Sequence, residues 1–360
     1  MVMAIGGWPD TRFLARSGLQ LPIVQAPMAG AGGSALAIAA IAGGALGSLP
    51  CGMSSPAAVR REVAAVRAAG AGPINLNFFC HTMPADDDDS AWRRRLAPFY
   101  AALAMDDPGA PPPLRMPFDA AMCAVVEELR PDVVSFHFGL PDAALLDRVR
   151  AAGAIVIGNA TSVAEARFLA ARGVDAIIAQ GWEAGGHAGR FLGGDPAEQM
   201  GLFALLPQVA DAVDVPVIAA GGIADARGIV AAFALGAAAV QVGTAYLRTP
   251  ESLASPMHRA ALADDRAEHT VVTNLFSGGL ARGLRNRLID TLGPIDPVAP
   301  AYPYASAALA PLRRLAEQRG DAGFSPLWAG QAARLGRDEP ARALTERLGR
   351  EALALLQRRA

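Results

Sequence analysis

The feature that most constrains the fold is a regular alternation between short apolar runs and longer segments of helical period. The apolar runs contain no polar alternation and are bounded by Gly, Pro or Asn, which is typical of strands buried on both faces of a parallel sheet. Eight such runs occur: Ile23–Pro27, Leu46–Leu49, Ile74–Phe78, Val133–Phe138, Ile155–Asn159, Ala176–Gln180, Pro216–Ala220 and Ala239–Gly243.

Between the runs, apolar residues recur every three or four positions, which predicts helices. Several of these segments begin at a capping residue or a proline, such as Ser55-Pro56 and Asp225. The predicted helices are Ser34–Ile41, Pro56–Ala69, Asp119–Leu129, Pro141–Ala152, Ser162–Arg172, Gly201–Val213 and Ala224–Leu235. The alternation predicts a (β/α)8 TIM barrel, an α/β fold whose active site lies at the carboxyl ends of the strands.

Two segments interrupt this alternation. Residues 81–117 carry an acidic run at 86–89 and prolines at 111–113, which predict a solvated excursion between the third strand and its helix. Residues 246–323, rich in Arg, Gly and Pro, predict a small helical cap inserted after the eighth strand. We therefore expect a barrel core over 12–245, a cap or lid over 246–323, and C-terminal helices over 324–360 that return to the barrel.

The composition favours an enzyme that acts on a small molecule. The 360 residues are 52% hydrophobic and 18% charged, with a formal net charge of -2, as in ordinary soluble domains. The scattered arginines form neither a basic stripe for nucleic acid nor a cationic amphipathic face for a membrane. The longest apolar stretch, residues 35–49, is interrupted by glycines and is short for a membrane span.

The residue types present also exclude some chemistry. All 32 basic residues are arginine, because the sequence contains no lysine. Aldolase-type imines and covalent pyridoxal phosphate both need a lysine amine, so these chemistries are excluded. Cys51, Cys80 and Cys123 form no C-x-x-C pair and the histidines show no ligand spacing, so neither a disulfide framework nor a metal site is expected. The N-terminus lacks the order of regions of a signal peptide, and we expect a cytoplasmic protein.

The stretch 180–189, Gln-Gly-Trp-Glu-Ala-Gly-Gly-His-Ala-Gly, is the strongest indication of a functional site. It follows a predicted buried strand, and such a glycine-rich loop brings the backbone close to a ligand. Gly185, Gly186 and Gly189 are too small to cover His187, so we expect its imidazole to face a cavity as an acid or base. A solvated loop histidine is the alternative.

Two further glycine loops follow the last predicted strands. Gly221-Gly222 ends the seventh strand and Gly243-Thr244 the eighth, which is where barrels bind a phosphate through backbone N–H groups. The sequence therefore predicts a phosphate site there, with tight turns that bind nothing as the alternative.

Polar side chains at other strand ends point to a flavin. Asn75 and Asn77 share one strand face, and with Gln180 they supply amide groups that match a flavin's pyrimidine edge; plain strand terminators are the alternative. His137 is either a second pocket residue or a core histidine. Residues 30–35 match the G-x-G-x-x-A dinucleotide fingerprint, but the acidic residue expected after the next strand is missing. We expect this first loop to approach the flavin ring instead.

A set of motifs resembles the nitronate monooxygenases, formerly called 2-nitropropane dioxygenases, over residues 21–348. The motifs are Gln25-Ala-Pro-Met-Ala-Gly30, Asn75-Leu-Asn-Phe-Phe-Cys-His81, Ser135-Phe-His-Phe-Gly-Leu-Pro141, Gln180-Gly-Trp-Glu-Ala-Gly-Gly-His187, Ala219-Ala-Gly-Gly-Ile-Ala-Asp225, Gln241-Val-Gly-Thr244 and Leu327-Trp-Ala-Gly-Gln331. Where family members have Arg after Gly-Gly-His, this chain has Ala188, and Arg190 is an open substitute.

The resemblance implies FMN as the cofactor and His187 as the catalytic residue. It places the FMN phosphate at the two glycine loops described above. The residues expected to bind FMN are Ala26, Pro27, Met28, Ala29, Asn75, Asn77, Gln180, Gly185, Gly186, Gly221, Gly222, Gln241, Gly243 and Thr244.

The implied activity is the FMN-dependent oxidation of alkyl nitronates, or of nitroalkanes, by dioxygen to a carbonyl compound and nitrite. His187 would remove the α-proton of a neutral nitroalkane or, when protonated, hold an anionic substrate. His137, Tyr302 and Tyr304 are the expected substrate contacts, with surface aromatics as the alternative for the tyrosines. The alternative function is an FMN-dependent NAD(P)H reductase of the enoyl-acyl-carrier-protein or quinone type. A flavin carrier without turnover and a homodimer are also left open.

Overall fold

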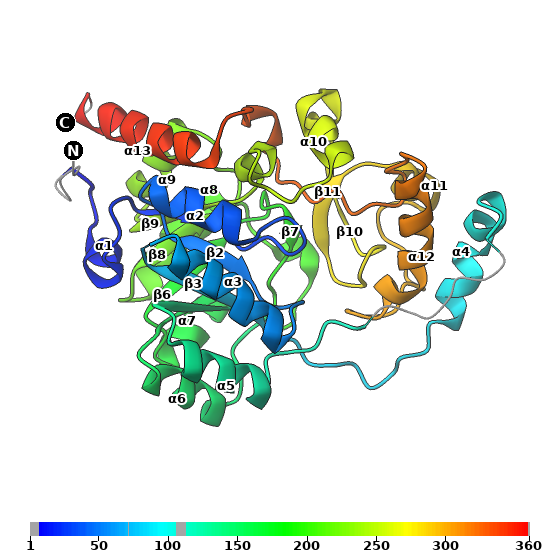
Figure 1. The fold of residues 1–360 in the computed structure, drawn as a ribbon, viewed down its shortest axis with the longest axis horizontal. Coiled ribbons are helices and arrows are strands. Elements are labelled where there is room, and N and C mark those ends of the chain that lie inside the picture. The colour runs from blue at the N-terminus through cyan, green and yellow to red at the C-terminus, as the bar shows by residue number, and fades with distance from the viewer. Residues whose placement is uncertain (1–6, 71, 106–112, 359–360) are drawn as a thin grey trace.

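The computed structural model describes residues 7–70, 72–105 and 113–358. Its central element is a barrel of parallel strands with helices around it (Figure 1). The strands are β1 (Ile23–Gln25), β2 (Gly47–Pro50), β3 (Ile74–Phe79), β4 (Val133–His137), β5 (Ile155–Ala160), β6 (Ala176–Gln180), β8 (Val217–Ala220) and β9 (Ala239–Val242).

The order of the strands is β1-β9-β8-β6-β5-β4-β3-β2, and every pairing within it is parallel. The two ends meet where the Gln25 N–H donates to the Leu46 carbonyl and the Leu46 N–H donates to the Ile23 carbonyl, both at 2.9 Å. The predicted TIM barrel is therefore confirmed. All eight predicted runs form strands of the barrel, because continuous apolar strands suit a sheet with both faces covered.

The helices also follow the prediction. They are α2 (Ser34–Ala42), α3 (Pro56–Ala68), α5 (Ala120–Leu129), α6 (Ala143–Ala151), α7 (Val163–Ala171), α8 (Leu202–Ala212) and α9 (Ala226–Ala234), after a short α1 (Arg12–Ser17). Five of them begin one or two residues later than predicted. In four of these five the residue before the helix is an N-cap whose side chain accepts the first free backbone N–H groups: Asp119, Asp142, Ser162 and Asp225.

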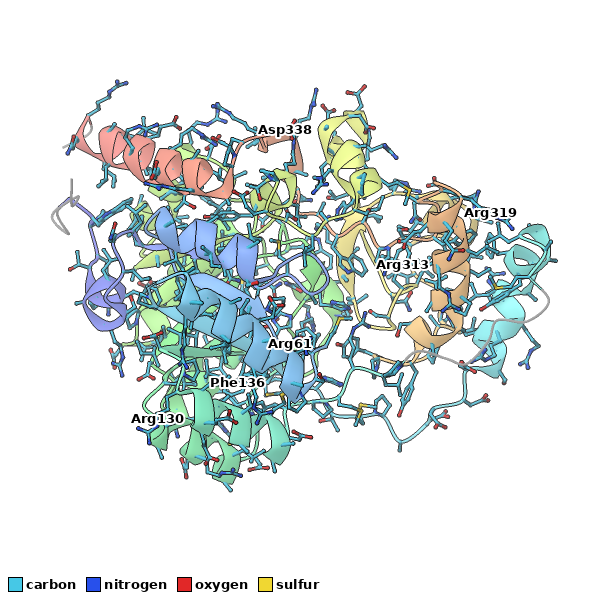
Figure 2. All side chains as sticks on the ribbon, viewed as in Figure 1. Arg61, Arg130, Phe136, Arg313, Arg319 and Asp338 are labelled. Carbon is cyan, nitrogen blue, oxygen red and sulfur yellow. The ribbon has the colours of Figure 1, made fainter. Side chains whose placement is uncertain are left out.

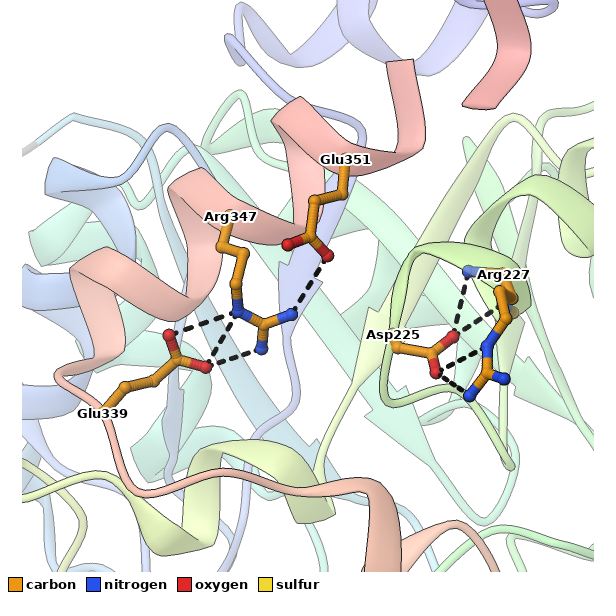
Figure 3. A network of polar contacts seen from close by, with 6 residues as sticks. Asp225, Arg227, Glu339, Arg347 and Glu351 are labelled. Atoms are coloured by element: carbon orange, nitrogen blue, oxygen red, sulfur yellow. Dashed lines mark hydrogen bonds and ion pairs between the residues drawn. The ribbon is translucent and has the colours of Figure 1, made fainter. Parts of the chain in front are cut away.

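The eighth barrel helix comes from the C-terminal part of the chain. Helix α13 (Ala341–Gln357) packs between α9 and α2, and Leu344 and Leu348 are buried there. Figure 3 shows Arg347 of α13 between two carboxylates: its guanidinium lies 2.5 Å from Glu339 and 3.3 Å from Glu351. The same view shows Asp225 capping the start of α9, where it pairs with Arg227 at 2.5 Å.

The cap lies beside the carboxyl ends of the strands and contains sheet as well as helix (Figure 1). Its helices are α10 (Pro256–Ala263), α11 (Arg287–Leu292) and α12 (Ala305–Gln318). Strands β10 (Thr270–Thr273) and β11 (Ala281–Leu284) form an antiparallel sheet with β7 (Gly186–His187). This sheet was not predicted, although Thr-Val-Val-Thr in β10 is a run of β-branched residues that favours strand. The division at residues 245/246 and 323/324 stays a prediction.

Part of the predicted solvated excursion is wrong. Helix α4 (Ser90–Ala102) packs against α12 of the cap, and Trp92 and Leu96 are fully buried in a cluster with Leu309 and Leu312. The acidic residues 86–88 are exposed as expected, whereas prolines 111 and 112 lie outside the described residues. The physical reason is that the short apolar face of α4 finds its partner in the cap, far along the chain, which a local pattern does not reveal.

Candidate active site

A cavity of about 350 Å³ lies between the carboxyl ends of the barrel strands and the cap. Phe136 of β4 and Arg313 of α12, both labelled in Figure 2, line it from the barrel and from the cap. Most residues predicted to form the site line this cavity: Ala26, Pro27, Met28, Ala29, Asn77, His137, Gln180, Gly185, Gly186, His187, Gly221, Gly222, Gln241, Gly243 and Thr244.

The loop that carries His187 is held by hydrogen bonds from the barrel. The His187 carbonyl accepts from Gln180 Nε2 at 2.9 Å and from His137 Nε2 at 3.2 Å. Gln180 Oε1 accepts from the Gly189 N–H at 2.8 Å and from Asn159 Nδ2 at 3.0 Å. Together with the β7–β11 pairing, these contacts fix the backbone of the loop and therefore the position of the His187 ring.

The imidazole of His187 is held by a residue of the cap. Its Nε2 lies 2.8 Å from Oγ of Ser277, which is buried. Burial lowers the pKa of His187 well below its ordinary value, and the nearby Arg115 and His137 lower that pKa further. His187 is therefore a neutral imidazole at neutral pH, with Nε2 held by the cap.

His137 is both a cavity residue and a structural one. It lines the cavity and holds the His187 carbonyl, so both alternatives raised for it are realised. Burial lowers the pKa of His137 to about 4, and the ring is neutral at neutral pH.

The two phosphate-type loops leave backbone donors free. Gly221 and Gly222 adopt φ values of +113° and +69°, which favour glycine. Within the described part of the chain, the N–H groups of Gly221, Gly222, Gly243 and Thr244 donate to no protein acceptor. The Thr244 hydroxyl accepts from the Gly330 N–H at 3.0 Å and so ties this loop to the 327–331 segment. Backbone N–H groups that converge in this way suit an anion.

The amide side chains differ in their freedom to bind a ligand. Gln241 Oε1 is buried and lacks a partner among the described residues, so it can accept from a ligand. The side-chain oxygen of Gln180 already accepts two hydrogen bonds, one from the Gly189 N–H of the loop and one from Asn159 of β5, and one N–H of the amide donates to the His187 carbonyl. One N–H of that amide is left for a ligand. Asn77 Nδ2 donates to Ser135 Oγ at 3.0 Å. Asn75 does not line the cavity, and its Nδ2 donates to Ser48 Oγ at 3.0 Å.

Neither tyrosine named by the sequence analysis lines the cavity. The ring of Tyr302 nevertheless contacts the His187 ring, with centroids 5.3 Å apart, and its hydroxyl is buried without a partner among the described residues. Burial raises the pKa of Tyr302 to about 12. Tyr304 Oη donates to the Pro84 carbonyl at 3.3 Å, which is a structural contact.

Arg115, Asn159, Ser277 and Trp328 were not predicted as site residues, although Trp328 lies in the 327–331 motif. Arg115, Asn159 and Trp328 line the cavity, and the rings of Trp328 and His187 are 5.4 Å apart. Asn159 is the last residue of a predicted strand, and this position could have indicated that it lies at the site. Arg115 and Ser277 come from irregular segments, where no period indicates direction. Arg190, the open substitute for the arginine that family members carry after Gly-Gly-His, does not line the cavity. It is half-buried, and its Nη2 donates to the Gly193 carbonyl at 2.9 Å.

Two kinds of site are absent from the described residues. They contain no group of three or more His, Cys, Asp or Glu side chains that would hold a metal ion. Nor does any helix in the described ranges have the length and apolar character needed to cross a bilayer.

Comparison with known proteins identifies the family. Residues 11–351 match the family model described as nitronate monooxygenase. The chain belongs to this family. A nitronate monooxygenase from Paraburkholderia phytofirmans is 41% identical over 346 residues, which cover 93% of each chain. The resemblance to nitronate monooxygenases, and with it the expectation of an oxidoreductase, is confirmed.

Solved structures agree with this assignment. A nitroalkane oxidase from Streptomyces ansochromogenes superposes with a TM-score of 0.87 at 39% identity, over 97% of this chain and 99% of that chain. FabK from Thermotoga maritima superposes with a TM-score of 0.73 at 27% identity, over 96% and 97% of the two chains. The nitronate monooxygenase fold thus accounts for almost the whole length of the protein, cap included.

Proposed function

We propose that this nitronate monooxygenase family member oxidises alkyl nitronates with FMN and dioxygen to a carbonyl compound and nitrite. The observation that carries the proposal is the half-buried, neutral His187, fixed beside a cavity whose lining also includes backbone N–H groups with no acceptor among the described residues. Family membership supports nitronates as the substrate class, and we expect the substrate to bind in the cavity beside His187.

The residues present fit FMN. The unpartnered N–H groups of Gly221, Gly222, Gly243 and Thr244 would hold its phosphate, and the orphaned Gln241 Oε1 would accept a hydrogen bond from it. Residues 26–29 would lie along the ring system. When bound, FMN supplies the electron acceptor for the substrate and passes electrons to dioxygen.

His187 has the properties of a base for neutral substrates. If Nε2–H donates to Ser277 Oγ, the lone pair on Nδ1 is available to take the α-proton of a nitroalkane. A protonated His187 that holds an anion is disfavoured, because burial and neighbouring groups lower its pKa. The neighbouring aromatic rings of Tyr302 and Trp328 help to exclude water from this end of the cavity.

The test begins with the visible spectrum of the purified protein. A flavin spectrum is expected, and ethyl nitronate added without oxygen should bleach it, whereas NADPH should not. In air, nitrite should accumulate. A colourless protein that does not take up FMN would contradict the proposal, and rapid bleaching by NADH or NADPH would instead support the reductase alternative.

A variant tests the role of His187. The change His187→Asn should lower kcat/KM for neutral nitroethane by at least about 100-fold, which is the usual range for losing a general base. The loss on preformed ethyl nitronate should be much smaller, because that substrate needs no proton removal. The exposed His269 gives the matched control, and His269→Asn should change neither rate. Equal losses on both substrates would rule out the role as base.

A further inference from the structure

Arg115 is a cation near His187 that has no counter-charge among the described residues. It lies in the segment between α4 and α5, lines the cavity, and has Cζ 5.9 Å from the ring centroid of Tyr302. Its Nη1 is buried, and within the described part of the chain that atom has no hydrogen-bond partner. None of the ion pairs among the described residues involves Arg115. Arginine stays protonated in proteins, so this charge persists.

The lining of the cavity does not neutralise Arg115 either. Among the described lining residues, Glu317 is the one carboxylate, and it is already paired with Arg313 Nε at 2.7 Å and with Ser325 Oγ at 2.6 Å. The lining histidines are held neutral by burial. The cavity therefore carries a net positive charge, and Arg115 is its source.

An unpaired buried charge is unfavourable unless a ligand compensates for it. Burial lowers the pKa of Arg115, because the charged form loses solvation inside the protein. The segment is nevertheless held in place, because His81 Nε2 donates to the Arg115 carbonyl at 3.0 Å and the His81 ring packs on Tyr302 with centroids 4.8 Å apart. The Tyr302 hydroxyl, also buried and without a partner among the described residues, adds a second donor in the same cluster.

We propose that Arg115 binds the anionic end of the substrate beside His187 and makes the site selective for planar anions over neutral molecules of the same shape. A guanidinium suits this task because its parallel N–H groups match the two oxygens of a nitronate, as they match those of a carboxylate. His187 is neutral and cannot supply this charge. That the anion is a nitronate rests on the proposed function; that Arg115 binds a planar anion does not.

Nitrate is the probe, because it is a planar oxyanion that needs no turnover. Its dissociation constant is measured by calorimetry on the protein as purified, beside that of acetamide as a neutral molecule of similar shape. Arg115→Gln should weaken nitrate binding by about 10- to 100-fold, the usual effect of losing a hydrogen bond to a charged group. Acetamide binding should stay within about twofold of the wild type.

Two further variants make the test specific. Arg190→Gln removes a half-buried arginine that follows the His187 loop and does not line the cavity, so it should leave the nitrate affinity unchanged. Arg115→Lys should bind nitrate with intermediate affinity, because an ammonium group keeps the charge but not the paired N–H groups. If the Gln variant does not fold, the Lys variant decides the question by its nitrate-to-acetamide ratio.

The proposal is overturned if wild-type protein does not bind nitrate, if Arg115→Gln binds it as tightly as the wild type, or if Arg190→Gln weakens it equally. Nitrate binding that depends on Arg115 would stand even if nitronates proved not to be substrates. Failure of the proposed function and failure of this inference are therefore separate results.

Discussion

The position of His187 depends on a residue that has no side chain. A Cβ on Gly189 would lie 2.7 Å from His137 Cε1 and would also contact the Asn159 amide, so only glycine lets the loop lie this close to the barrel. The hydrogen bond from the Gly189 N–H to Gln180 depends on that close approach.

Gly189→Ala should therefore displace the loop and lower the free energy of unfolding by about 1–3 kcal/mol, the usual cost of overpacking. Gly228→Ala is the matched control, because its Cβ would meet its nearest neighbour at 3.5 Å and alanine favours helix α9. Urea unfolding followed by circular dichroism measures both. Equal stability of the two variants would show that the loop adapts without cost.

At this scale the sequence predicts which residues line the cavity where they belong to strands or follow them. Gln180 ends an apolar run, Gly221 follows one and Gln241 lies near the end of one, and a barrel brings the carboxyl ends of all its strands together. Ser277 and Arg115 could not be found in this way, because they sit in segments without period whose direction is set by packing against distant parts of the chain. The contact between Arg115 and Tyr302 arises from tertiary packing, and the local sequence pattern around either residue does not indicate it.

Among the elements, α13 shows how an ion pair secures the barrel. Arg347 is 9% exposed and lies between Glu339 and Glu351, whereas Arg342 on the same helix pairs with Glu346 in a largely exposed position. A pair removed from water is stronger than an exposed one, and breaking it leaves a poorly solvated carboxylate.

Arg347→Met should lower the free energy of unfolding by about 2 kcal/mol, within the range for hydrogen bonds to charged groups. Arg342→Met, the control on the same helix, should cost no more than about 0.5 kcal/mol. Chemical denaturation of both variants at one pH gives the comparison. If the control is destabilised as much as Arg347→Met, burial of the pair is not what secures α13.

The barrel helices and strands were predictable because period and capping are local properties. The cap sheet was not, because β7 is two residues long and gains its identity only by pairing with β11, about 95 residues later in the chain. Helix α4 is a similar case: its charged run of arginines looks solvent-facing, and its burial follows from α12.

For the molecule as a whole, the buried histidines predict how stability depends on pH. Burial lowers the pKa of His137 and of His258 to about 4, while the same groups in the unfolded chain protonate near their ordinary value of 6.5. Between these values the unfolded chain binds more protons than the folded one. The free energy of unfolding therefore falls as the pH falls from 6.5 towards 4, by about 3 kcal/mol for each such histidine.

His258→Gln tests this directly, since His258 donates to the Trp328 carbonyl and glutamine keeps a donor. Urea denaturation at pH 7, 6 and 5 should show a shallower loss of stability in the variant than in the wild type, with the gap widening as the pH falls. If the free energies of unfolding of the variant and the wild type fall with pH in parallel, His258 does not contribute to the pH dependence. The loss of stability in acid would then come from other groups.

The packing of α4 on α12 has a mechanical consequence. The barrel and the cap are connected at several separate places. The segment with α4 leaves the barrel after β3 and returns before α5, β7 pairs with the cap sheet, and the chain passes into the cap again after β9. A single hinge cannot swing one half away from the other without bending all of these links at once. Substrate and product must then enter and leave the cavity through small local rearrangements of side chains at its rim, and not through a hinge motion that separates the cap from the barrel.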